Sequence, residues 1–256
     1  MLDYNSLTNR QGLIVWGGEN STDYGMVVGG APAFDKPIRR TEVFNVPGRN
    51  GSVIFQDGSY DDVTRTYHIW IAENETPDSG GVIHDTLAER VSALTAWLYS
   101  KQGYTRLEDN FEPDVFRLAY YSGSNNISNE LTQYGETDLT FTCRPERFYK
   151  DAETPIAVAN GDTLTNPTKF ASKPLIKIEA AGTVIVTING VSITAIVTDY
   201  IYIDCERMNA YRLASENKND KISGSFPEIV PGTNAVAISV TGTLTGVKVT
   251  PRYFSI

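Results

Sequence analysis

Histidine and cysteine are scarce in this 256-residue chain, which contains two of each. His68 lies in an apolar and aromatic run typical of a strand, and His84 lies at the start of a helical segment. We interpret the first as structural and the second as exposed. Cys143 and Cys205 are 62 residues apart, and neither has a second cysteine or a histidine at ligand spacing. We therefore expect two buried, reduced thiols, no metal and no cofactor.

The motifs that carry catalytic chemistry are also missing. No Gly-x-Ser-x-Gly sequence is present for a hydrolase nucleophile, and the glycine-containing run at 47–51 lacks the Lys-Ser/Thr of a phosphate-binding loop. Paired carboxylates could serve a glycoside hydrolase, but the candidate acids crowd turn regions, where solvated acids are common. These acids are Asp57, Asp61, Asp62, Asp109, Glu112 and Asp114. We expect no enzyme; turnover of labelled wall polysaccharide would reveal a glycoside hydrolase instead.

Positive charge is sparse as well. The net charge is −9, and the longest run of basic residues is the pair Arg39-Arg40. Because affinity for nucleic acid rests on neutralising phosphates, this pattern excludes a typical nucleic-acid-binding protein. No apolar run approaches the roughly 20 residues that a membrane helix needs, and the N-terminus lacks the basic start and apolar stretch of a secretory signal. We expect synthesis in a cytoplasm and no membrane partner.

Short strand-like segments, rich in β-branched residues and tyrosine, make up most of the first half. They lie at 12–16, 24–28, 39–46, 52–56 and 64–71. The pair Asp57-Gly58 predicts a hairpin between the last two segments. Bulky side chains on both faces of the last segment predict a strand that is covered on both sides. We interpret all three tryptophans, Trp16, Trp70 and Trp97, as core residues.

One segment has a helical period. Between residues 77 and 103, apolar residues recur at steps of three and four, which predicts one amphipathic helix packed on a sheet. Gly103 supplies the expected C-terminal stop. The apolar residues on this face are Ile83, Leu87, Val91, Leu94 and Leu98.

A polar run near residues 145–155 marks the best candidate for a domain boundary. After it, strands recur on a short period without helical segments, and Asn189-Gly190 between two alternating apolar runs predicts a hairpin. This pattern is typical of a β-sandwich or jelly roll. We therefore predict a mostly β protein with two domains, residues 1–148 and residues 149–256.

Several stretches occur in an order known from one protein family. An extended segment ends in Val46-Pro47-Gly48-Arg49-Asn50-Gly51 and precedes Asp57-Gly58. A helix ending in Ala96-Trp97-Leu98 follows, and a strand leaves the first domain through Phe-x-Cys-x-Pro at 141–145. Further matching stretches lie at 103–107, 113–119, 173–176, 202–204, 224–227 and 231–234. Over nearly its whole length the chain resembles the siphophage distal tail proteins.

The resemblance implies a structural protein of the virion, at the distal end of the phage tail. Its N-terminal domain would be a β-sandwich with one packed helix and a hairpin arm, and its C-terminal domain a galectin-like β-sandwich. Six copies would form a ring, either alone or stacked on a second ring, that joins the tail tube protein to the tail-associated lysin or tip protein. Receptor-binding components would attach to it, and DNA would pass through without specific binding at ejection.

A closed ring uses a heterologous interface, and extended hairpin arms suit such an interface because they add edge hydrogen bonds and buried area. We predict that Gly48 and Gly51 shape the turn of such an arm. The predicted ring-interface residues are Val46, Pro47, Gly48, Arg49, Asn50, Gly51, Asp57 and Gly58.

The alternative function is a carbohydrate-binding β-sandwich module involved in recognition of the host cell wall. Its mark would be exposed aromatic residues clustered with polar and charged ones on one sheet face. Residues 150–256 contain no tryptophan and no histidine, which counts against typical galectin chemistry.

Overall fold

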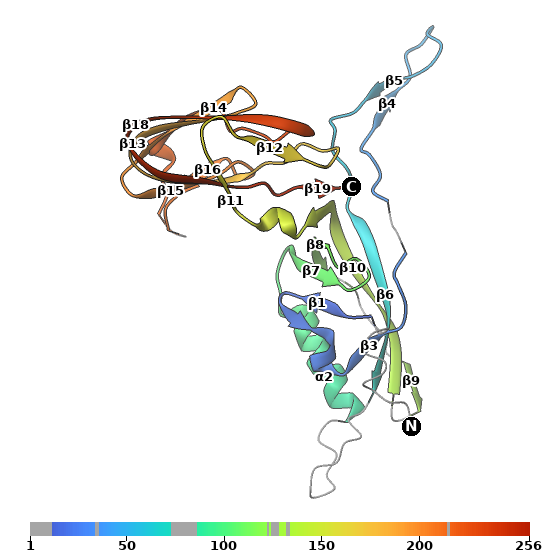
Figure 1. Ribbon diagram of the computed structural model, residues 1–256. Coiled ribbons are helices and arrows are strands. Elements are labelled where there is room, and N and C mark those ends of the chain that lie inside the picture. Colours follow the sequence, from blue (N-terminus) through green and yellow to red (C-terminus); the bar gives the residue numbers. More distant parts are fainter. Residues whose placement is uncertain are drawn as a thin grey trace, which may run out of the picture. The chain divides into compact units, whose positions relative to one another are not determined.

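The computed structural model describes residues 12–33, 36–72, 86–121, 123, 128–131, 134–213 and 216–256 (Figure 1). Within these residues the chain is mostly β and contains one α-helix, which confirms the predicted fold class. The chain divides into two compact units: unit 1 runs to Arg147, and unit 2 spans Phe148–Ser255. None of the described helices has the length and apolar composition needed to cross a membrane.

Unit 1 is built on a curled sheet with the strand order β2-β1-β7-β8-β10-β6-β3, and β9 also pairs with β10. A backbone bridge between Gly12 and Val28 joins the segment leading into β1 to β3 at the far end of this order. The sheet therefore curls until its ends meet. Its elements are β1 (Ile14–Trp16), β2 (Glu19–Asn20), the 3-10 helix η1 (Ser21–Tyr24), β3 (Met26–Val28), β6 (Val63–Ala72), β7 (Thr105–Asp109), β8 (Val115–Tyr121), β9 (Ser128–Leu131) and β10 (Tyr134–Tyr149).

Strand β6 alternates between a buried and an exposed face. Tyr67, Ile69 and Ile71 are buried, whereas His68 is exposed and Trp70 is 39% exposed. The partners of the exposed pair on β10 are acidic: the Nδ1 of His68 lies 2.8 Å from Asp138, and the Nε1–H of Trp70 donates to Glu136 at 3.2 Å. The prediction that both faces are covered is therefore wrong. So is the core position of Trp70, although Trp16 and Trp97 are buried as predicted.

The helix α2 (Leu87–Tyr99) packs its apolar face on the sheet, next to β6. Leu94, Trp97 and Leu98 are buried, and Trp97 stacks on Tyr24 of η1 with ring centroids 4.7 Å apart. The amphipathic helix is therefore confirmed where it is described; Ile83 and His84 lie outside the described residues.

Both ends of α2 have local explanations. Thr86 and Glu89 form a capping box, in which each side chain accepts a hydrogen bond from the other residue's backbone N–H. At the C-terminus, Ser100 is the capping residue and its hydroxyl donates to the carbonyl of Trp97. The stop predicted at Gly103 is therefore wrong, because the helix has already ended before this glycine.

Unit 2 is a second sheet with the strand order β11-β18-β13-β14-β17; β12 pairs with β18, β15 with β13, and β16 with β15. Its elements are the 3-10 helix η2 (Asp151–Glu153), β11 (Ile156–Val158), β12 (Thr163–Asn166), β13 (Leu175–Ile188), β14 (Val191–Val197), β15 (Tyr200–Asp204), β16 (Asn209–Tyr211), the 3-10 helix η3 (Asn219–Lys221), β17 (Ile222–Gly224) and β18 (Gly232–Thr250). The short strand β19 (Phe254–Ser255) follows β18 and is not part of this sheet.

The longest strand pair of unit 2 is the antiparallel ribbon of β13 and β18, which runs through the centre of its sheet (Figure 1). β13 is one continuous strand from Leu175 to Ile188, and it bends where Gly182 faces Gly242 of β18. Both glycines have φ above +120°, and a Cβ added to Gly182 would lie 2.0 Å from the carbonyl oxygen of Thr241. β13 pairs with β15 before the bend and with β14 after it, so one ribbon serves both halves of the sheet.

Turn chemistry and a bulge fix the register of this ribbon. The Asn189-Gly190 turn joins β13 to β14 with both residues at positive φ, which confirms the predicted hairpin. Opposite Glu179 and Ala180 the register shifts so that Thr245 has no partner. A bulge of one residue exchanges the two faces of a strand beyond it, so the buried positions of β18 change from even numbers to odd ones.

Each unit holds one buried carboxylate whose pKa lies below its ordinary value. Burial alone would raise the pKa of Asp109, but hydrogen bonds from Tyr67 and Arg65, and the charge of Arg65, lower it overall. In unit 2, burial alone would likewise raise the pKa of Asp204. The Arg252 guanidinium, which donates to both carboxylate oxygens at 2.8 and 3.2 Å, and the backbone N–H groups of Glu206 and Arg207 together lower it overall. Both aspartates are therefore held ionised inside the fold.

The two cysteines are buried free thiols, as predicted. Burial raises the pKa of each thiol to about 12, with nearby charges as smaller influences. Thiolate formation is therefore suppressed at neutral pH.

Candidate subunit interface

A hairpin arm extends from unit 1 between residues 38 and 61. Its strands β4 (Glu42–Phe44) and β5 (Val53–Phe55) pair with each other in the register Glu42↔Phe55, Val43↔Ile54 and Phe44↔Val53. They form a separate two-stranded sheet, and neither pairs with any other described strand (Figure 1). Isolated two-stranded hairpins are marginally stable in water, so the arm needs support from its base or from a partner.

The base of the arm is held by polar contacts across the two chains. Arg39 and Tyr60 form a backbone bridge, and the Arg39 guanidinium donates to the Tyr60 hydroxyl at 2.8 Å. Beside them, the Nε of Arg40 donates to Asp61 at 2.7 Å, and this hydrogen bond raises the pKa of Arg40. Because both side chains of this ion pair are more than half exposed, it orients the arm more than it stabilises the fold.

The Asp57-Gly58 pair does not form the predicted hairpin between 52–56 and 64–71, because β5 pairs with β4 and β6 pairs with β3 and β10. Instead, Asp57 accepts hydrogen bonds from the backbone N–H and hydroxyl of Ser59, and these bonds lower its pKa. Glu42 pairs with Phe55, and Arg39 pairs with Tyr60. Between these two pairs the returning half of the arm contains two more residues than the outgoing half. The pair therefore forms a local turn within the returning half of the arm.

Both faces of the arm are apolar and exposed. Paired residues share a face, so Val43 and Ile54 lie on one side and Phe44, Val53 and Phe55 on the other. Seven large apolar side chains of the arm are between 38% and 72% exposed. They are Ile38, Val43, Phe44, Val46, Val53, Ile54 and Phe55. Large contiguous apolar surface of this kind marks interaction sites in soluble proteins.

The predicted interface residues lie in exposed turns of this arm. Residues 46–51 form the tip between β4 and β5, with Gly48 and Gly51 at φ of about +80°, as the predicted turn requires. The Arg49 side chain has no hydrogen bond or ion pair among the described residues, and Arg49 is the only charged residue between Glu42 and Asp57. The tip thus presents one unpaired positive charge on a chain of net charge −9.

The prediction missed most of the apolar surface that the arm presents. It named Val46 but not Val43, Phe44, Ile54 or Phe55. Their apolar run was visible in the sequence, but such a run is equally typical of a strand buried inside its own domain. The distinguishing fact is that the described chain places nothing over these side chains.

Comparisons with known proteins agree with this architecture. Residues 28–143, which include the arm, match the family model described as the phage tail protein RIFT-related domain. This part of the chain is therefore similar to a family of phage tail protein domains, in agreement with the predicted resemblance to siphophage distal tail proteins. No curated protein matches the sequence significantly.

A solved structure extends the likeness to the whole chain. The chain is similar to the Dit protein (gp 19.1) of phage SPP1, described as a paradigm of the hub adsorption apparatus in phages that infect Gram-positive bacteria. The TM-score is 0.71 at 13% sequence identity, and the match covers 96% of this chain and 99% of the other. At this identity the likeness shows a common fold, including both units.

Proposed function

We propose that this chain is a non-enzymatic structural subunit of a phage tail tip, in which six copies form a ring. Residues 1–148 form the ring and the galectin-like residues 149–256 lie outside it. The ring joins the tail tube to the tail-associated lysin and the receptor-binding components, and DNA passes through at ejection. The family domain and the fold of a hub protein support this role. The observation that carries the ring is the arm, whose apolar faces are left exposed by the described residues of the chain.

The arm fits a heterologous contact between neighbouring copies. Each of its seven large apolar side chains has a substantial fraction of its surface still exposed, so covering it on a neighbour stabilises the contact by about 1 kcal/mol per side chain. Among the described strands, none pairs with the outer edges of β4 and β5, so these edges can accept hydrogen bonds from another chain. A head-to-tail contact of this kind produces a closed ring when the rotation that relates neighbouring copies adds up to a full turn.

Two double variants test the arm one face at a time. Val43→Ser with Ile54→Ser alters one face, and Phe44→Ser with Phe55→Ser alters the other. Each pair should weaken a contact that covers its face by about 2 kcal/mol per interface, or roughly thirtyfold. Mass by light scattering with negative-stain imaging reports assembly, and tryptophan fluorescence reports whether unit 1 remains folded. Ile196→Ser, an exposed position on β14 of unit 2, is the control.

We expect the wild type and the control to form rings and at least one double variant to dissociate while its fluorescence stays unchanged. Because the altered side chains are already exposed in the monomer, folding should not suffer. A wild type that stays monomeric at every concentration, or double variants that both assemble like wild type, would refute the role of the arm.

Charge reversal at the tip gives an independent measure. Arg49→Glu should weaken the ring if the unpaired guanidinium meets an acidic neighbour, whereas Arg49→Lys keeps the charge and should retain most of the assembly. The difference should shrink at high salt because exposed charges are screened. A reversed variant that runs as an intact ring at low concentration contradicts the assignment of Arg49 to the interface.

A further inference from the structure

The outer face of the unit 2 sheet carries a cluster of tyrosines. In the register of β13, β15 and β16, Lys177 pairs with Tyr202, Glu179 with Tyr200, and Tyr202 with Tyr211. Paired residues share a face, and the residues between them, such as Ile178 and Ile201, belong to the core on the other side. The three tyrosines therefore lie together on the face that points away from the core, each half-buried.

The rings are held in place by one another and by two cations. Tyr202 and Tyr211 stack with centroids 5.4 Å apart and an interplanar angle of 15°, and Tyr200 meets Tyr202 edge-on at 5.9 Å. The Lys177 ammonium lies 5.5 and 5.6 Å from the centres of Tyr200 and Tyr202, and the Arg212 guanidinium lies 5.1 Å from that of Tyr200. Such contacts preorganise aromatic rings before any ligand arrives.

Hydrogen-bonding groups of both kinds surround these rings. Glu179 forms an ion pair with Lys177 at 2.5 Å and is an acceptor, while Lys248, next to Lys177 on β18, has no side-chain hydrogen bond or ion pair among the described residues. Within the same set of residues, the hydroxyls of Tyr200 and Tyr211 make no hydrogen bond either. The face thus offers an unpaired ammonium, two unpaired hydroxyls and a carboxylate.

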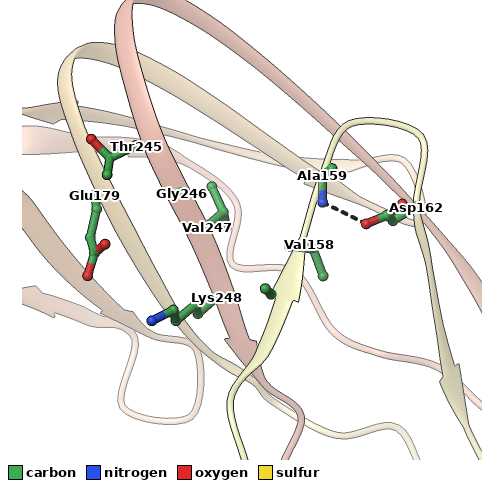
Figure 2. Close-up of a pocket in the computed structure, with 9 residues that line it drawn as sticks. Val158, Ala159, Asp162, Glu179, Thr245, Gly246, Val247 and Lys248 are labelled. Atoms are coloured by element: carbon green, nitrogen blue, oxygen red, sulfur yellow. Dashed lines mark hydrogen bonds between the residues drawn. The ribbon is translucent and has the colours of Figure 1, made fainter.

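An open pocket of about 430 Å³ adjoins this face. Figure 2 shows Gly246 and Val247 of β18 in the middle of its lining, Glu179 and Lys248 on one side, and Val158 with Asp162 on the other. Space is available at Gly246, because a Cβ added there would meet no atom within 4 Å. The volume of the pocket is in the range of small-molecule sites, which combine apolar walls with a few polar groups.

We propose that the tyrosine cluster and this pocket form a saccharide-binding site, with a sugar ring against the tyrosines and its hydroxyls bonded to Lys248 and Glu179. A sugar has apolar C–H faces that suit aromatic rings and hydroxyls that both donate and accept. The charges favour a neutral glycan over a polyanion, because Lys177 and Arg212 are already paired with Glu179 and Asp199 and because Asp162 adds a negative charge to the pocket lining. The site lies wholly within unit 2 and does not depend on ring formation.

Two variants test the site in different ways. Gly246→Leu fills the pocket at a position with ordinary φ and free space, so unit 2 should remain folded. Tyr202→Ala removes the central ring of the cluster. The full-length protein is applied to a printed array of bacterial and mammalian glycans, and the oligosaccharide bound best is titrated by calorimetry. Ile196→Ala, exposed on β14, is the control, and light scattering of the same samples reports assembly separately.

We expect wild type and control to bind the same oligosaccharide and both variants to weaken that binding at least about tenfold, the effect of losing about 1.4 kcal/mol. Oligomer mass should not change, which separates this result from a failure of the ring. The proposal is overturned if no glycan binds at millimolar concentration, or if the bound glycan is insensitive to Gly246→Leu.

Discussion

The stability of unit 1 should depend on a buried ion pair that joins β6 to β7. Asp109 accepts hydrogen bonds through Oδ2 from the Nη2 and Nε of Arg65, at 2.7 and 3.0 Å, and from the Tyr67 hydroxyl at 2.7 Å. Through Oδ1 it accepts from the backbone N–H groups of Phe111 and Glu112. Only 2% of the Asp109 side chain and 4% of the Arg65 side chain are exposed. Asp109→Asn keeps the shape and the Oδ1 acceptor but removes the charge.

The expected cost of Asp109→Asn is about 3 kcal/mol. Removing one partner of a buried pair typically costs about 3 to 5 kcal/mol, because the remaining charge is left uncompensated. Here Arg65 keeps a contact of 3.1 Å with Glu112, which favours the lower end. Glu112 cannot compensate fully, since it also binds Arg117 at 2.6 Å and Arg147.

Urea unfolding followed by tryptophan fluorescence measures this cost in unit 1 alone, because all three tryptophans precede Arg147. The matched control is Asp138→Asn, which breaks the exposed pair with His68, where the Asp138 side chain is 64% exposed. Exposed pairs contribute about 0 to 1 kcal/mol. If Asp109→Asn costs no more than Asp138→Asn, the buried pair does not stabilise unit 1 as argued.

Three further predictions follow from local geometry. The pKa values of Asp109 and Asp204 are lowered in the folded state, so their contribution to stability is complete above the unfolded value of about 3.9 and is lost as pH falls through the folded values. The urea midpoints of both units should therefore fall below pH 4, and the midpoint of unit 1 should fall less in Asp109→Asn than in wild type. Gly182→Ala should destabilise unit 2 by about 3 kcal/mol or more in thermal melts, since its Cβ would meet backbone at 2.0 Å, whereas Gly246→Ala should change it by less than about 0.5 kcal/mol. Thr86→Ala should cost unit 1 about 1 kcal/mol through loss of the capping box, and an unchanged urea midpoint would contradict that role.

Features that depend on neighbours in the sequence could be predicted, and features that depend on distant partners could not. The apolar period of α2 and the Asn189-Gly190 turn are local, so the pattern alone indicates them. The pairing of Arg65 with Asp109 joins residues 44 apart, and no local pattern indicates it. The hydrogen bond from the exposed Trp70 to Glu136 on β10 likewise joins residues 66 apart.

Both candidate binding surfaces illustrate this limit from opposite sides. The arm strands have apolar residues at successive positions, which is the pattern of a strand buried on both faces. The pattern does not indicate that both faces of the arm stay exposed among the described residues. For unit 2, the absence of tryptophan and histidine counts against sugar binding, yet the sheet brings Tyr200, Tyr202 and Tyr211 from two strands into one cluster. The absence of tryptophan and histidine is therefore weak evidence against a binding site, because strand register can bring commoner residues such as tyrosine together in one cluster.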